Sequence, residues 1–142
     1  MPGITVGIDG SEHSVRALEW ALKEGALRHA HVTIITVHSV PESGWTHTPM
    51  TLPRDSADRE EEARGAEEMT QKVISQLGEA QPSGVTVRAV IGYPAKELIG
   101  ASRDAELMVV GSRGSGGFAR LMIGSVSSQV VDHAHCPVVV VH

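Results

Sequence analysis

Aromatic residues, cysteine and long apolar runs are all scarce in this sequence. Aromatic side chains make up only 3% of the 142 residues, but 41% of the residues are apolar and 20% are charged, so the composition is that of a globular protein. Cys136 is the single cysteine, which excludes an internal disulfide and favours a reducing, cytoplasmic location. No run of about 18 apolar residues occurs, so no membrane-spanning helix is predicted.

Basic residues are also fewer than acidic residues. The 17 acidic residues outnumber the 12 Lys and Arg residues, which gives a formal net charge of −5. This balance argues against a general nucleic-acid surface or an anionic-membrane surface. The first residues lack the basic segment and long apolar segment of a secretory signal. The length of 142 residues fits a single domain, 1–142, with room for a real core.

Apolar segments alternate between strand-like and helix-like spacing along the chain. Strands are predicted at 4–8, 32–37, 85–90, 107–110 and 137–141, and helices at 11–29, 55–77, from 94 onward, and from 124 or 125 to about 134. Alternating units require a parallel sheet with right-handed crossovers and helices on both faces, which is a three-layer α/β/α fold. Ligands of such sheets bind at the carboxyl ends of the strands, where the strand order reverses.

Two stretches need a separate interpretation. Residues 41–53 contain three prolines and form a long connection, so we expect a mobile loop or a lid there. Residues 58–64 are heavily charged, and we interpret them as a solvated helix face rather than an acidic docking surface.

Glycine is concentrated in the stretch 107–125. A short apolar run ends at Gly111, three more glycines follow within six residues, and Gly124 opens a predicted helix. Glycine lets the main chain approach a ligand, and the free N–H groups of a first helical turn face that ligand, as in many anion sites. Arg113 and Arg120 lie in 111–125 without any carboxylate, a local reversal of charge that suits phosphate.

Other glycine-loop motifs fit this stretch poorly. A P-loop needs a lysine, and no lysine follows Lys96. Residues 114–119 match a loose Gly-x-Gly-x-x-Ala fingerprint, but they follow the fourth strand and lack an acidic residue about 20 positions on. The Gly-x-Ser-x-Gly elbow of serine hydrolases is absent. A flexible loop without a ligand explains neither the glycine spacing nor the two arginines.

A longer signature covers the same stretch. Gly111-Ser-Arg-Gly114, nine residues and Gly124-Ser125 match the Gly-x2-Gly-x9-Gly-[Ser/Thr] pattern of ATP-binding universal stress proteins. Segments 6–11, 92–95 and 133–141 look like that family's opening strand and turn, third helix start and closing strand. The chain therefore resembles a single-domain member over essentially its whole length. The resemblance implies the sheet order 3-2-1-4-5 and a Rossmann-like, adenine nucleotide alpha hydrolase-like fold.

The resemblance also implies a role for each matching position. Four residues would hold the phosphates: Gly111, Gly114, Gly124 and Ser125. The loop residues Ser112, Arg113, Ser115, Gly116 and Gly117 would wrap around them.

The nucleoside would lie across two other strands. By the resemblance, Asp9 would hydrogen-bond the ribose, Gly7 would lie close beneath the nucleoside, and the main chain of Val37 would meet the adenine edge. Without a ligand, Asp9 would be a turn or capping residue and Val37 a core strand residue. His38 is interpreted as a strand-end histidine rather than as a border of the adenine pocket.

The implied ligand is ATP, or ADP or AMP, with Mg²⁺ as its expected companion, although no acidic cluster is dedicated to the ion. The implied function is that of a nucleotide-dependent regulatory protein of the stress response. The alternative is a slow ATPase or phosphotransferase. Hydrolysis needs a positioned base, and the nearest downstream acid, Asp132, is predicted at the far end of its helix. No catalytic residue is therefore assigned, and at most very slow hydrolysis is expected.

Two further expectations concern the end of the chain. His133, His135 and Cys136 are only three potential metal ligands beside a helix C-terminus, where histidines are ordinary dipole partners, so no metal site is predicted. The strand Val138–Val141 is apolar, and the resemblance places it at a sheet edge, so we expect a homodimer paired along it. A client protein is also expected, but no residue identifies it.

Overall fold

The computed structural model describes residues 3–39, 53–113 and 124–142, with the main chain alone over 53–59. Its strands are β1 (Gly3–Ile8), β2 (His31–Ser39), β3 (Gly84–Gly92), β4 (Ala105–Gly111) and β5 (Val138–Val141). Its helices are α1 (Glu12–Arg28), α2 (Pro53–Gln76), α3 (Pro94–Ala101), the 3-10 turn η1 (Ser102–Asp104) and α4 (Ser125–His133). The order of elements agrees with the sequence-based prediction. Most of the predicted loop or lid, 41–53, lies outside the described residues.

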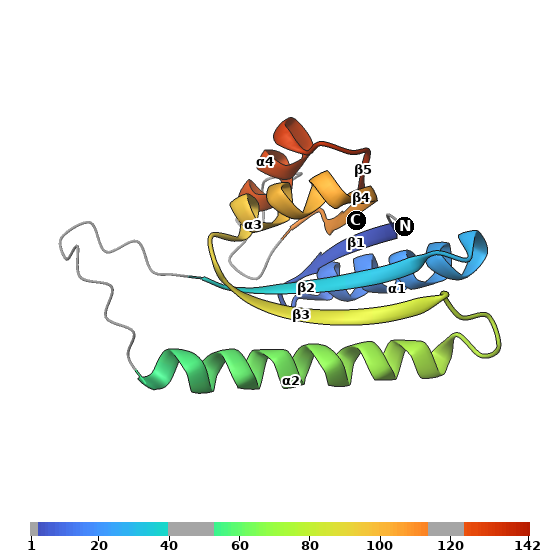
Figure 1. The fold of residues 1–142 in the computed structure, drawn as a ribbon, viewed down its shortest axis with the longest axis horizontal. Coiled ribbons are helices and arrows are strands. Elements are labelled where there is room, and N and C mark those ends of the chain that lie inside the picture. Colours follow the sequence, from blue (N-terminus) through green and yellow to red (C-terminus); the bar gives the residue numbers. More distant parts are fainter. Residues whose placement is uncertain (1–2, 40–52, 114–123) are drawn as a thin grey trace.

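The five strands of the described sheet are all parallel, in the order β3-β2-β1-β4-β5 (Figure 1). The predicted fold class and sheet order are therefore confirmed. The chain leaves β1 for β2 and β3 on one side and then returns to β4 on the other side of β1. The strand order thus reverses at β1 and β4, whose carboxyl ends mark the place where sheets of this kind bind ligands.

Each face of the sheet has its own core. On one face, Ile4 and Val6 of β1 pack with Leu18 of α1, and all three side chains are fully buried. On the other face, Met108 of β4 packs with Leu98 of α3 in a second cluster. Figure 1 shows α3 and α4 beside β4 and β5 at the top of the view and α2 alongside β3 at the bottom. Because both faces of the central strands are covered, most of their buried residues are apolar, and Thr5 is a buried polar exception.

Helix α1 begins and ends at clear local signals. The Ser11 side chain caps the first turn by accepting the N–H of Ser14 (3.2 Å), and Glu12 lies in that turn. The helix ends at His29, whose left-handed conformation (φ 53°) lets its N–H bond the carbonyls of Gly25 and Ala26. These caps fix the direction in which α1 leaves β1, and so they position the first turn of α1 beside the end of β4.

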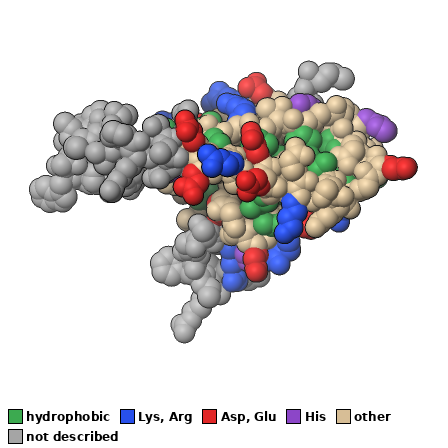
Figure 2. Space-filling model, turned by 90° about the horizontal axis from the view of Figure 1, so that it is seen from below, with side chains coloured by type: hydrophobic (Ala, Val, Ile, Leu, Met, Phe, Trp, Pro, Cys, Tyr) green, Lys and Arg blue, Asp and Glu red, His purple; other side chains and the backbone are tan. Residues whose placement is uncertain are grey.

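Helix α2 is amphipathic with a solvated outer face. Ala66, Thr70 and Val73 are buried at helical spacing, whereas Glu60 and Arg64 are exposed. Figure 2 shows acidic and basic side chains interspersed over this side of the molecule. The interpretation of 58–64 as a solvated face therefore holds for its described side chains.

No helix in the described part of the chain combines the length and the apolar character needed to cross a bilayer.

Candidate functional site

The turn after β1 presents an exposed carboxylate at the carboxyl end of the central strand. Gly10 has a positive φ of 84°, which lets the chain turn sharply from β1 into α1. Asp9 Oδ1 accepts the N–H of Ser11 (2.9 Å), so this side chain also stabilises the turn. Both of the uses considered for Asp9 are therefore compatible with its position: it is a turn residue, and it is exposed at the switch point.

The two ends of the glycine-rich stretch are joined by hydrogen bonds. Gly124 N–H donates to the Ser112 carbonyl (2.5 Å), and the hydroxyl of Ser127 donates to the Gly111 carbonyl. Ser112 N–H donates to the Val141 carbonyl (2.8 Å) at the end of β5. The main chain on either side of the loop is thus held in one place. The predicted loop residues Gly114, Ser115, Gly116 and Gly117 lie outside the described residues.

These hydrogen bonds change one expectation about the phosphate donors. The N–H groups of Ser112 and Gly124 already bond to carbonyls of the protein, so they stabilise the fold. Ser125 is exposed in the first turn of α4, where the helix dipole favours an anion. Gly124 has φ −75° and ψ 166°, an extended conformation open to any residue, so its backbone angles do not require glycine.

The first turn of α1 lies directly against the end of β4. A Cβ atom on Gly111 would lie 2.8 Å from the His13 carbonyl carbon and 2.9 Å from its oxygen, so only glycine fits there. His13 Nδ1 is 3.4 Å from Ser112 Oγ and 3.1 Å from Arg16 Nη2. The sequence analysis missed His13 and Arg16. Their spacing of three on the helix that follows Asp9 is the signal that was available.

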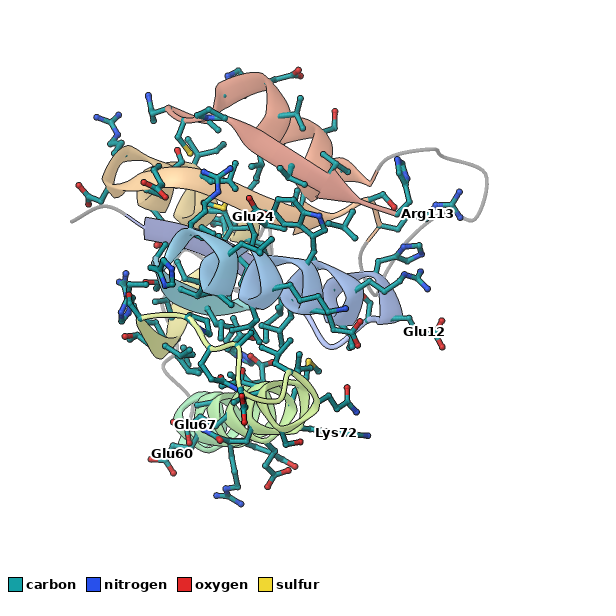
Figure 3. All side chains as sticks on the ribbon, turned by 90° about the vertical axis from the view of Figure 1, so that its right-hand side faces the viewer. Glu12, Glu24, Glu60, Glu67, Lys72 and Arg113 are labelled. Atoms are coloured by element: carbon teal, nitrogen blue, oxygen red, sulfur yellow. The ribbon has the colours of Figure 1, made fainter. Side chains whose placement is uncertain are left out.

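Arg113 is half-buried just beyond the end of β4. Figure 3 shows Arg113 and Glu12 along the same side of the view, with Glu60 of α2 on the opposite side. The expected arginine of the glycine-rich stretch therefore lies on the same side as the start of α1. Arg120 lies outside the described residues.

Gly7 has a structural reason to be glycine. A Cβ atom at this position would lie 2.7 Å from Leu98 Cδ1 of α3, so the absence of a side chain lets α3 pack on the sheet. Gly7 also lies within β1, paired with Ile35 of β2.

Strand β2 continues two residues beyond its predicted end at Val37. The strand pairs with β3 as far as Ser39, whereas its pairing with β1 stops at Thr36. Val37 therefore lies just past the end of β1, and its half-buried side chain packs on the second core. His38 Nδ1 lies 3.0 Å from Glu62 Oε1 of α2, which supports the interpretation of His38 as a strand-end histidine.

The histidines near the end of α4 behave as ordinary helix-end residues. His133 lies exposed in the last turn of α4, and His135 N–H donates to the buried Ser102 Oγ (2.9 Å). Burial raises the pKa of the Cys136 thiol, and a hydrogen bond with the Met108 main chain opposes that shift. Over residues 3–39, 53–113 and 124–142, no group of three or more metal-ligating side chains is gathered.

The sequence profile of the Universal stress protein family matches residues 2–142. The chain belongs to this family. A universal stress protein of Mycolicibacterium smegmatis is 39% identical over 143 residues, which cover 99% of this chain and 48% of that protein. Universal stress protein Rv2623 of Mycobacterium tuberculosis is 36% identical over 141 residues, 99% of this chain and 47% of that protein. The chain thus spans about half the length of the curated relatives it matches.

Solved structures of the family share the fold. The universal stress protein UspA from Lactobacillus plantarum superposes with a TM-score of 0.82 at 24% identity, covering 99% of this chain and 97% of that one. A universal stress protein in complex with cAMP gives a TM-score of 0.68 at 24% identity, with coverages of 99% and 96%. An Archaeoglobus fulgidus member in complex with dAMP gives 0.65 at 23% identity, with coverages of 100% and 98%.

Proposed function

We propose that this universal stress protein domain binds an adenine nucleotide, in the first instance ATP, and that the nucleotide regulates its interaction with a client protein. The observation that carries the proposal is the meeting of two segments at the switch point of the sheet. Asp9 is exposed after β1, and the two ends of the Gly-x2-Gly-x9-Gly-Ser signature are fastened together after β4 by the Gly124–Ser112 hydrogen bond. Family members in complex with cAMP and dAMP support an adenine nucleotide as the ligand.

The proposed placement follows the chemistry of each segment. Asp9 accepts hydrogen bonds from the ribose hydroxyls, and the main chain of Val37, beyond the end of β1, meets the adenine. The phosphates lie at the signature, from Gly111 to Ser125, and at the amino end of α4. We expect Mg²⁺ to accompany ATP through the phosphate oxygens. Asp132 is exposed in the last turn of α4, at the opposite end of that helix from Ser125, so it is no base for hydrolysis, and regulation is favoured over turnover.

The test uses the helix cap at Gly124. Asp and Asn both cap helices well, so Gly124→Asp and Gly124→Asn should retain or improve the stability of α4. Only the aspartate places a negative charge at the proposed phosphate position. We expect wild type to bind ATP in calorimetry, Gly124→Asp to lose binding, and Gly124→Asn to retain more of it than the aspartate variant. Equal affinities of the Asp and Asn variants, or a wild type that binds none of ATP, ADP, AMP and cAMP, would contradict the proposal.

We also propose that two copies pair along β5. In the described sheet β5 lies at the edge, with β4 on one side. The Pro137 carbonyl accepts from Met108 of β4, and the Val141 carbonyl accepts from Ser112, the residue after β4. By the alternation of a strand, the main-chain groups of Val138 and Val140 therefore point outward. The four valines are half-buried because they pack on the two cores, so main-chain pairing rather than side-chain burial is the basis of this interface.

A proline substitution in β5 separates main-chain pairing at the sheet edge from side-chain packing. Val140→Pro removes an outward N–H and leaves the β4–β5 ladder in place. Val140→Ala loses side-chain packing but keeps the N–H. We expect light scattering to give a dimer for wild type and Val140→Ala, and a monomer for Val140→Pro. A monomeric wild type at tens of micromolar would exclude this interface.

A further inference from the structure

One side chain of α1, His13, contacts the fixed end of the glycine signature, and a second side chain, Arg16, contacts His13. His13 Nδ1 is 3.4 Å from Ser112 Oγ and 3.1 Å from Arg16 Nη2. Ser112 is only 2% exposed, and hydrogen bonds hold both its N–H and its carbonyl. His13 is half-buried and Arg16 is exposed. His13 is thus held against the protein, and Arg16 faces solvent.

The contact with Arg16 determines which nitrogen of the His13 imidazole carries the hydrogen. A guanidinium group only donates hydrogen bonds, so His13 Nδ1 accepts and the ring hydrogen lies on Nε2. No hydrogen bond between described residues engages that Nε2–H group. It is therefore a donor at the end of α1 that faces β4, beside the guanidinium donors of Arg16.

The site needs such donors because part of its main chain is already engaged. The N–H groups of Ser112 and Gly124 bond to carbonyls of the protein. Charged groups among the described residues near the ends of β1 and β4 include Arg113 after β4, Glu12 in the first turn of α1 and Asp9 before it. Figure 3 shows Arg113 and Glu12. The two acidic groups oppose an anion, and their effect grows with each added phosphate charge. Side-chain hydrogen-bond donors, one of them the cationic guanidinium of Arg16, are what a polyphosphate requires there.

We propose that His13 and Arg16 form an anion-recognition pair that makes the site prefer adenine nucleotides with more than one phosphate. This inference rests on the proposed nucleotide binding and deepens it. The phosphate nearest the ribose is held by the signature itself. The additional phosphates accept hydrogen bonds from Arg16 and from His13 Nε2–H, while His13 also keeps Ser112 in position.

The test compares the affinities for ATP and AMP, measured by calorimetry in one buffer containing Mg²⁺. The variants are Arg16→Ala, His13→Ala and His13→Gln, with Lys23→Ala as the matched control, since Lys23 is an exposed cation farther along the same helix. We expect Arg16→Ala and His13→Ala to weaken ATP binding by about tenfold and AMP binding by less than about twofold, as loss of a hydrogen bond to a charged group predicts. His13→Gln keeps a side-chain donor and should restore part of the ATP affinity.

Each outcome bears on one claim. Equal losses of ATP and AMP affinity would mean that His13 and Arg16 act only by supporting the position of Ser112. That result would overturn the proposal that they recognise the additional phosphates. A wild type that binds AMP as tightly as ATP would also overturn it, while leaving nucleotide binding intact. A wild type that binds neither nucleotide would refute the proposed function instead. Arg16→Ala removes an exposed side chain, so this variant tests the pair even if the His13 variants fold poorly.

Discussion

On the β4 side of the site the main chain is held by hydrogen bonds between different elements. On the β1 side the exposed Asp9 carboxylate accepts the N–H of Ser11 in the same turn. Ser112 connects β4 to β5 and α4, and Ser127 of α4 reaches back to Gly111. Gly111, Ser112 and Ser127 are buried, whereas Asp9 is exposed. Residues of one site therefore differ in how strongly their replacement destabilises the fold. Loss of a buried contact at Gly111 or Ser127 should alter stability and binding together, whereas Asp9→Asn should alter binding with little change in stability.

The largest effect on stability is expected from Gly111→Ala. Its new Cβ would press on the main chain of His13, which cannot move as a flexible side chain would. Overpacking of this kind costs about 1–3 kcal/mol, and urea unfolding measures it. Gly100→Ala is the matched control, because no described atom lies within 4 Å of a Cβ there, and an alanine in a helix should stabilise slightly. If the two variants unfold at the same urea concentration, the close approach of α1 to β4 is wrong.

A smaller loss is expected from Ser127→Ala. The substitution removes the buried donor to the Gly111 carbonyl and should lower the free energy of unfolding by about 1–2 kcal/mol. Ser128→Ala makes the same chemical change one residue later on α4 and controls for helix propensity. The comparison between the two sides predicts that nucleotide affinity falls along with stability in Ser127→Ala. Unchanged affinity in a destabilised variant would show that the position of Gly111 does not matter for binding.

The smallest change in stability is expected from Asp9→Asn. The amide oxygen can still accept the Ser11 N–H, so the free energy of unfolding should change by less than about 0.5 kcal/mol. The variant loses the charge that strengthens hydrogen bonds to the ribose, so nucleotide affinity should fall about tenfold or more. Calorimetry and urea unfolding on the same sample give both values. A clear loss of stability with full affinity would reverse the comparison and make Asp9 a purely structural residue.

Local signals explain what the sequence alone could predict. The Ser11 cap, the Pro94 helix start and the alternating apolar segments act within a few residues, and each element lies where they indicated. Strand β2 was placed too short because His38 and Ser39 are polar, yet both remain paired with β3. Hydrogen-bond pairing with a neighbouring strand, rather than the polarity of a residue's side chain, decides where such a strand ends.

The parts of the site that the sequence did not predict depend on contacts between distant residues. His13 and Ser112 are 99 positions apart, and their contact exists only because α1 and β4 meet at the switch point. Gly7 and Gly111 were interpreted through a ligand, whereas a side chain at Gly7 would press on Leu98 and one at Gly111 would press on the His13 main chain. A sequence pattern can show that a glycine is required, but it cannot distinguish a neighbouring helix from a ligand as the cause.

The hydrogen bond from Ser112 to Val141 has a thermodynamic consequence for the β5 edge. Ser112, the second residue of the signature, donates its N–H (2.8 Å) to Val141 of the strand on which we expect a second copy to pair. If pairing at that edge displaces Val141, it also changes the position of Ser112 and with it the nucleotide affinity. Linkage then requires the reverse: the nucleotide must change the dimerisation constant by the same factor. The same hydrogen bond would therefore convert the concentration of nucleotide in the cell into a proportion of paired and unpaired chains.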